Sequence, residues 1–118
     1  MARRYKQYAA ETGISYEYFF AGTHRVIRPE GQGPGSDYEF VVVPGASPPF
    51  TLRVFVSDSA LVAWRGARGR DLSPNEVYAA VKMRLFQAFD ESPSLRDDCL
   101  SLLVDGSNIE ALLEPLDL

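Results

Sequence analysis

The sequence has little of what metal and redox sites are most often built from. Its 118 residues contain one cysteine, Cys99, and one histidine, His24. A single cysteine excludes a disulfide within the chain and is compatible with a reducing compartment. Because zinc and iron sites mostly use several cysteine or histidine ligands, the usual ligand sets are nearly excluded, and we expect neither a metal nor a cofactor.

The chain also lacks a long apolar run. No stretch approaches the length that a membrane-spanning helix needs, and the charged start Met1–Lys6 is not followed by an apolar segment. The hydrophobic content of 46% and the charged content of 24% are ordinary for a globular protein. We therefore expect a soluble, cytoplasmic protein with no membrane partner, folded as a single domain over residues 1–118.

The two ends of the chain carry opposite charge, because acidic residues are scarce at the start and basic residues are scarce at the end. Residues 1–28 hold five basic and two acidic side chains, whereas residues 90–118 hold eight acidic and one basic. Such segments attract each other within one chain or between two copies. An ordinary solvated surface is the alternative, and the sequence favours it.

The clearest structural signal is a helix that begins at Pro74. Ser73 and Glu76 have the spacing of a capping box, and proline is favoured at the first helical position. We predict a helix from Pro74 to about Asp90 with one apolar face. That face comprises Val77, Tyr78, Val81, Leu85, Ala88 and Phe89. Met83 and Phe86 lie off it, so they are either covered by a second layer or exposed.

Alternating apolar residues before this helix predict strands. The predicted strands cover residues 14–20, 24–28, 37–43 and 50–56, with a turn at residues 21–23. In the last of them Phe50, Leu52, Val54 and Val56 point inward. The fold class is therefore α+β, with an antiparallel sheet of four strands, or five in the alternative, the long amphipathic helix packed on one face and short C-terminal helices.

The ends and connections of the fold are less sharply specified. Residues 2–12 fit either a short helix or a frayed terminus, and residues 29–36 and 65–71 read as flexible loops. Residues 95–104 favour a helix, with a fifth strand through residues 100–104 as the rival. A capping box at Ser107–Glu110 predicts a last short helix that ends before Pro115.

Aromatic residues are concentrated in the first predicted hairpin. Apolar side chains there occur on both strand faces, and surplus apolar surface in a small domain often marks an interface, most often with a second copy. A core that uses all of this surface is an equal alternative. The candidate interface residues are Tyr16, Tyr18, Phe19, Met83 and Phe86.

A short Arg-Gly segment is the second candidate site. Arg65, Arg68 and Arg70 are spaced by glycines, and arginine binds phosphate with two parallel hydrogen bonds. The net charge of −4 argues against a nucleic-acid domain, because such domains are mostly basic. An ordinary solvated connector is the favoured interpretation.

The lone histidine is the third candidate. As a general base, His24 needs an orienting carboxylate, and Glu17 is the nearest one across the predicted hairpin. A surface histidine beside a carboxylate is the ordinary interpretation. We expect no catalytic, metal or cofactor residues.

These patterns support three hypotheses of function. The first is a small non-enzymatic interaction or accessory module that self-associates, most simply as a homodimer. The second is a nucleic-acid-binding accessory protein that uses residues 65–70. The third is a small-molecule-binding domain or enzyme with a cleft between sheet and helix near His24.

Overall fold

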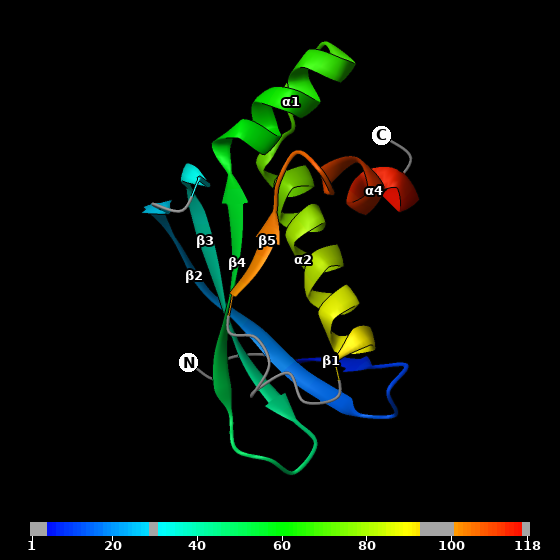
Figure 1. Cartoon of the computed structure of the whole chain (residues 1–118). Helices are drawn as coiled ribbons and strands as arrows, with labels where there is room; N and C mark the ends of the chain where they lie inside the picture. The colour runs from blue at the N-terminus through cyan, green and yellow to red at the C-terminus, as the bar shows by residue number, and fades with distance from the viewer. Residues whose placement is uncertain (1–4, 29–30, 93–100, 117–118) are drawn as a thin grey trace.

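A computed structural model describes residues 5–28, 31–92 and 101–116. These residues form an α+β structure in which a five-stranded mixed sheet is combined with helices (Figure 1). The elements in chain order are β1 (Lys6–Ala9), β2 (Ser15–Arg28), β3 (Gly33–Pro44), β4 (Phe50–Ser57), α1 (Asp58–Arg68), α2 (Pro74–Glu91), β5 (Ser101–Val104), α4 (Ile109–Leu113) and the 3₁₀ turn η1 (Glu114–Leu116).

The strands lie in sequence order, β1-β2-β3-β4-β5. The first four form an antiparallel meander, so the predicted antiparallel arrangement is correct for them, although the predicted strands 14–20 and 24–28 are the single strand β2 and β1 was not predicted as a strand. The purely antiparallel prediction is wrong at β5, which pairs with β4 in parallel, Arg53 opposite Ser101. Parallel neighbours need a long crossover connection, and here α1 and α2 lie within it.

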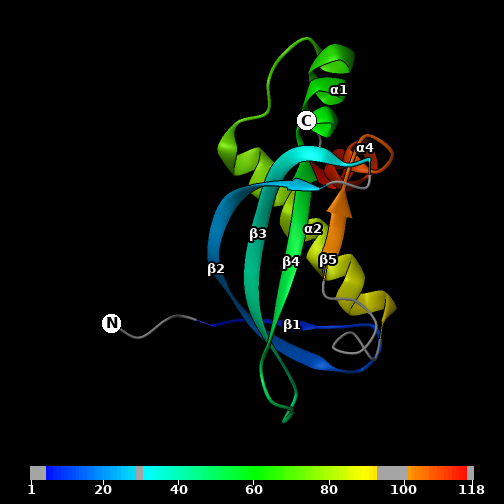
Figure 2. The ribbon, with the colours of Figure 1, turned by 60° about the vertical axis from the view of Figure 1, so that its left-hand side comes forward.

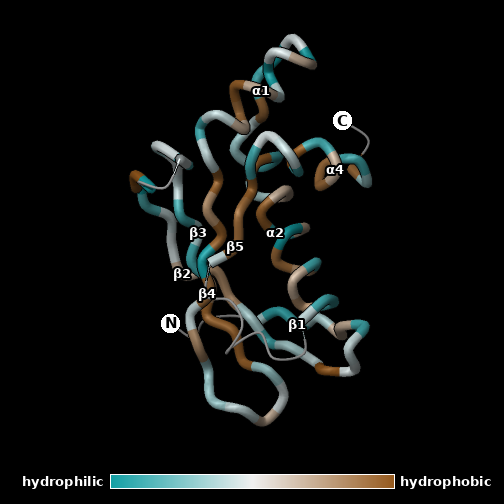
Figure 3. Tube along the Cα trace, in the orientation of Figure 1, coloured by the Kyte–Doolittle hydropathy of each residue, from teal (hydrophilic) through white to brown (hydrophobic). Residues whose placement is uncertain are grey.

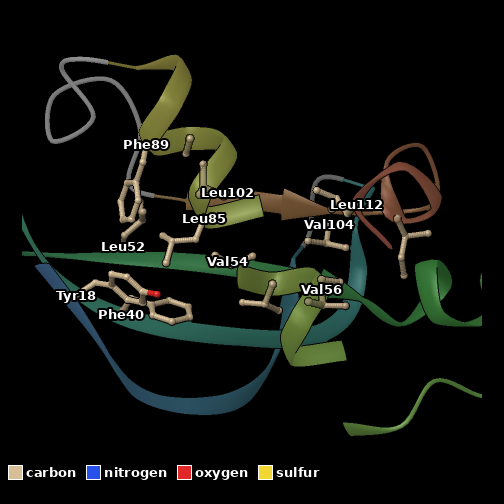
Figure 4. Packing of buried hydrophobic residues seen from close by; sticks show 14 of the residues in the cluster. Tyr18, Phe40, Leu52, Val54, Val56, Leu85, Phe89, Leu102, Val104 and Leu112 are labelled. Carbon is tan, nitrogen blue, oxygen red and sulfur yellow. The ribbon is translucent and has the colours of Figure 1, made fainter. Parts of the chain in front are cut away.

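The long helix α2 is confirmed from Pro74 and covers one face of the sheet. The Glu76 N–H donates to Ser73 Oγ at 3.2 Å, and the Ser73 N–H donates to Glu76 Oε1 at 2.8 Å, which completes the capping box. Hydropathy along the chain rises where α2, β4 and β5 face one another (Figure 3). The core between them includes Leu52, Val54, Val56, Leu85, Phe89, Leu102 and Val104 (Figure 4).

Two predictions at the start of the chain are wrong. Residues 6–9 form β1 and not a helix, because they pair with Ser15–Tyr18 of β2. Residues 21–23 are not a turn, because β2 runs through them and carries a bulge between Phe20 and Gly22. A bulge bends a strand without ending it, and Figure 2 shows β2 strongly bowed at the outer side of the sheet. The predicted loop 29–36 is shorter than expected, since β3 begins at Gly33; residues 29–30 lie outside the described residues.

The predicted flexible connector is also mostly helical. Helix α1 continues through Gly66 to Arg68 and ends where Gly69 adopts the left-handed conformation, with φ of 75°, donating its N–H to Arg65 O. Near the C-terminus, the alternative prediction of a fifth strand is correct for residues 101–104. The remainder of the predicted helix, residues 95–100, lies outside the described residues. The short helix before Pro115 is present as α4, but Asn108 and not Ser107 occupies its N-cap, so the second capping box is wrong.

Candidate functional site

Most of the predicted interface aromatics are buried in the core or packed against it. Tyr16 and Tyr18 are 1% and 3% exposed, and the Tyr16 ring stacks on Phe89 with centroids 4.2 Å apart. Burial raises the pKa of both phenols. They belong to the core, so they offer no surface to a partner.

Met83 and Phe86, which lie off the predicted apolar face of α2, are partly covered as well. The Phe86 ring lies parallel to Tyr8 with centroids 4.4 Å apart, and Met83 packs against the core. Phe19 is half-buried and meets the Tyr5 ring edge-on at 4.9 Å. Tyr8 of strand β1 therefore supplies a second layer over Phe86.

Two of the three arginines of the second candidate, Arg68 and Arg70, lie over the Trp64 ring. The guanidinium carbons of Arg68 and Arg70 lie 5.7 and 5.0 Å from the Trp64 ring centroid. Each arginine also has a carboxylate partner: Arg65 pairs with Asp71 at 3.5 Å, Arg68 with Glu110 at 3.8 Å, and Arg70 with Glu76 at 3.0 Å. Their charge is thus offset locally, which adds nothing in favour of nucleic-acid binding; that hypothesis stays a prediction.

The pair between Arg70 and Glu76 gives a testable pH dependence. The Arg70 guanidinium, followed by the backbone hydrogen bond from Ser73, lowers the pKa of Glu76 to about 2. A carboxylate with a lowered folded-state pKa stabilises the fold above its ordinary value near 4.3, and that contribution is lost as pH falls toward 2. We expect Glu76→Gln to lower the free energy of unfolding at pH 7 and to equal the parent near pH 2, measured by urea denaturation across that range.

Glu17→Gln is the matched control, since Glu17 is an exposed carboxylate on β2. Its effect on the free energy of unfolding should be small at every pH. A Glu76→Gln deficit that persists undiminished at pH 2 would contradict the assignment.

His24 pairs with Glu39 and not with Glu17. Its Nε2 donates to Glu39 Oε1 on the neighbouring strand β3, and Arg53 Nε on β4 lies 3.5 Å from the same oxygen. Glu17 and His24 share the single strand β2, so the hairpin that was to join them does not exist. The hydrogen bond from His24, supported by the charge of Arg53, lowers the pKa of Glu39. His24 remains 55% exposed, and this row of polar side chains fits a solvated sheet surface.

A buried polar group on the same face was missed by the sequence reasoning. Asp37 is 4% exposed, and Arg28 Nη2 contacts its two carboxylate oxygens at 2.8 and 2.9 Å. The Arg28 guanidinium also lies over the Phe55 ring, 5.3 Å from its centroid. The ring in turn covers Gly35, where an added Cβ would stand 2.5 Å from Phe55 Cζ. These four residues come from three strands, so no local pattern links them.

The outer edge of β2 is the largest uncovered backbone feature of the described chain. Strand β1 pairs only with Ser15–Tyr18, whereas β2 continues to Arg28. Within the described residues nothing pairs with the outer side of residues 20–28, which we call the free edge (Figure 2). Along it Phe20 is 41% exposed and Ile27 is 76% exposed. A shallow hollow lined by Arg25, Val26, Ile27 and Pro34 adjoins its end, and His24 does not line it.

The two lysines of the chain lie beside each other. Lys6 begins β1, and Lys82 lies on α2 with its Nζ 5.8, 5.9 and 5.7 Å from the ring centroids of Tyr18, Tyr78 and Phe86. Burial, followed by the charge of Lys6, lowers the pKa of Lys82. No local pattern predicts this pair, because the two residues are far apart in the chain.

Comparison with known proteins gives no functional information. No protein-family model, no curated protein and no solved structure matches the chain. In the part of the chain that the structure describes, no helix has the length and apolar character to cross a membrane, and no three histidine, cysteine, aspartate or glutamate side chains gather as a metal site.

Proposed function

We propose that this chain is a cytoplasmic, non-enzymatic interaction module that self-associates as a homodimer through the free edge of β2. The observation that carries the proposal is the length of backbone left unpaired at residues 20–28 within the described chain. Unpaired strand edges are ready templates for a further strand, and many proteins bind partners by adding one.

The side chains of the free edge favour pairing more than they oppose it. Charged residues usually protect an edge strand by resisting a close neighbour. Here the charges of the two arginines are offset within the chain, Arg25 by Asp58 at 2.5 Å and Arg28 by Asp37 at 2.8 Å. Ile27, by contrast, projects into solvent. The edge therefore combines unpaired backbone with an apolar side chain and little uncompensated charge.

A second copy is the partner that this geometry fits most simply. Two β2 strands placed antiparallel about a twofold axis present identical surfaces to each other, which is the symmetry of most homodimers. Such pairing would extend the two sheets into one continuous sheet. It would also bring Ile27 of each copy against the edge of its partner.

Sedimentation velocity over a range of concentrations tests this proposal. We expect a mass that approaches twice the monomer mass as concentration rises. Ile27→Lys should weaken the dimer at least tenfold, because an edge lysine would have to lose its hydration beside a neighbouring strand. The side chain is already in solvent, so the monomer should keep its fold and its thermal midpoint.

Val62→Lys is the matched control. Val62 is 70% exposed on α1 and does not belong to strand β2, so its substitution should leave the dimer unchanged. A strict monomer at the highest concentration would overturn the proposal. Equal weakening by Ile27→Lys and Val62→Lys would also overturn it, since the contact would then not be specific to β2.

A further inference from the structure

We propose that Lys6 and Lys82 form a binding site for an aryl phosphate, that is, a phosphate group carried on an aromatic ring. This inference does not depend on the proposed dimer. It rests on where the cationic side chains of the chain find partners. Lys6 and Lys82 are the only lysines of the sequence. Lys6 of β1 stands opposite Tyr18 of β2 in the sheet, and Lys82 Nζ of α2 lies 5.8 Å from the centroid of the same Tyr18 ring, so the fold brings the two lysines to one place between β1 and α2.

Unlike six of the described arginines, the two lysines have no carboxylate partner within the part of the chain that the structure describes. Six described arginines, at positions 25, 28, 53, 65, 68 and 70, form ion pairs with aspartate or glutamate. Arg84 donates to Leu103 O at 3.2 Å. Among the described residues, neither Lys6 nor Lys82 has an acidic group within ion-pair distance. In an acidic chain, this juxtaposition of two unpaired cations is unusual.

The two ammonium groups also disfavour each other. Like charges held side by side cost free energy, and the charge of Lys6 contributes to the lowered pKa of Lys82. The aromatic rings under Lys82 compensate in part through cation–π attraction. A bound dianion would relieve the remaining repulsion. Two positive charges match the two negative charges of a phosphate monoester better than the single charge of a carboxylate.

A partly exposed ring that shares a neighbour with Lys82 indicates what the phosphate is attached to. Tyr78 lies under Lys82 and also meets the Phe20 ring, with centroids 5.3 Å apart. Phe20 is 41% exposed, so part of its apolar surface is open one ring away from the cation. An aromatic group on the phosphate would cover this surface by ring stacking, which adds to the charge attraction. The combination of two lysines and one open ring favours an aryl phosphate over phosphate alone.

Lysine NMR tests the site directly, because the chain has only two lysines and each gives its own side-chain signals. With ¹³Cε-labelled lysine, phenyl phosphate should shift the signals of both lysines together and with saturation. Inorganic phosphate should bind at least threefold more weakly, and benzoate more weakly still. The pH at which Lys82 loses its proton should rise when phenyl phosphate is bound, since the dianion favours the charged amine.

Substitutions separate the two parts of the site. Lys82→Gln and Lys6→Gln should each reduce affinity for phenyl phosphate at least tenfold. Because each removes repulsion, neither should lower the thermal midpoint. Phe20→Leu should weaken phenyl phosphate and leave inorganic phosphate unchanged. Arg65→Gln, which removes a paired cation elsewhere, is the control and should change neither affinity.

A further arm identifies the source of the aryl phosphate. A short neutral peptide carrying one phosphotyrosine should bind more tightly than phenyl phosphate if the natural ligand is a phosphorylated protein, and equally if it is a small molecule. Either result supports the site. Unsaturable shifts, equal binding of all three anions, or shifts that survive Lys82→Gln would overturn it.

Discussion

Gly35→Ala is expected to destabilise the protein by about 3 kcal/mol, near the upper end of what overpacking costs. A Cβ at this position would stand 2.4 Å from Val56 O and 2.5 Å from Phe55 Cζ. The carbonyl belongs to the paired neighbouring strand and cannot move without breaking the β3–β4 ladder. The movement of the ring is also restricted, because the Arg28 guanidinium lies over it, 5.3 Å from its centroid. Urea denaturation should therefore give a lower midpoint with an unchanged slope.

Gly66→Ala is the matched control for the same chemical change. Gly66 lies within α1, and an added Cβ there meets nothing within 4 Å. Alanine is the better helix former, so this variant should be more stable than the parent by about 0.5–1 kcal/mol. The two substitutions should thus have opposite signs. A Gly35→Ala protein as stable as the parent would contradict the close packing at Phe55.

Arg28→Ala is expected to cost about 3 kcal/mol, because it leaves the Asp37 carboxylate buried without its charged partner. Asp37 is 4% exposed, and both of its oxygens contact Arg28 Nη2. The same variant uncovers the Phe55 ring. The free energy of unfolding at pH 7, from urea denaturation, measures the loss.

Two further variants isolate the role of burial. Arg25→Ala removes an ion pair of similar geometry with Asp58, but that pair is exposed, so its loss should be much smaller. Replacing both partners, in Arg28→Met with Asp37→Leu, should recover most of the stability, since a well-packed apolar pair avoids the buried charge. If Arg28→Ala and Arg25→Ala prove equally mild, Asp37 is not held in a dry environment.

The parts of the fold that the sequence predicted are those specified by neighbouring residues. Helix α2 is encoded within one turn by Ser73, Pro74 and Glu76, and β4 by its alternating apolar residues. By contrast, β1 is a strand only because it pairs with β2 and because Tyr8 stacks on Phe86. The first contact is a short hairpin whose strand, Lys6–Ala9, has no alternating apolar pattern, and the second joins distant parts of the chain, so no local pattern predicted β1.

Glycine was the main source of error in the predicted boundaries. Gly22 suggested a turn but lies at a bulge in a continuous strand, and Gly66 suggested a loop but lies within α1. In each case packing of the surrounding residues outweighs the conformational preference of one glycine. The same limit applies to the candidate sites. The lysine pair and the Arg28–Asp37 pair arise from sheet register and helix packing, whereas the predicted interface tyrosines were recognised as aromatic but not as buried.

The parallel strand β5 has a consequence for the order in which the chain folds. The antiparallel meander β1–β4 joins near neighbours, so its pairing closes only short loops. Pairing of Arg53 with Ser101 must instead close a loop that contains both α1 and α2. Helix formation shortens this intervening chain, and so lowers the entropy that closure costs. We therefore expect the last strand to join the sheet after α2 has folded onto it, and expect the capping box at Ser73 to influence the folding rate as well as the stability of the helix.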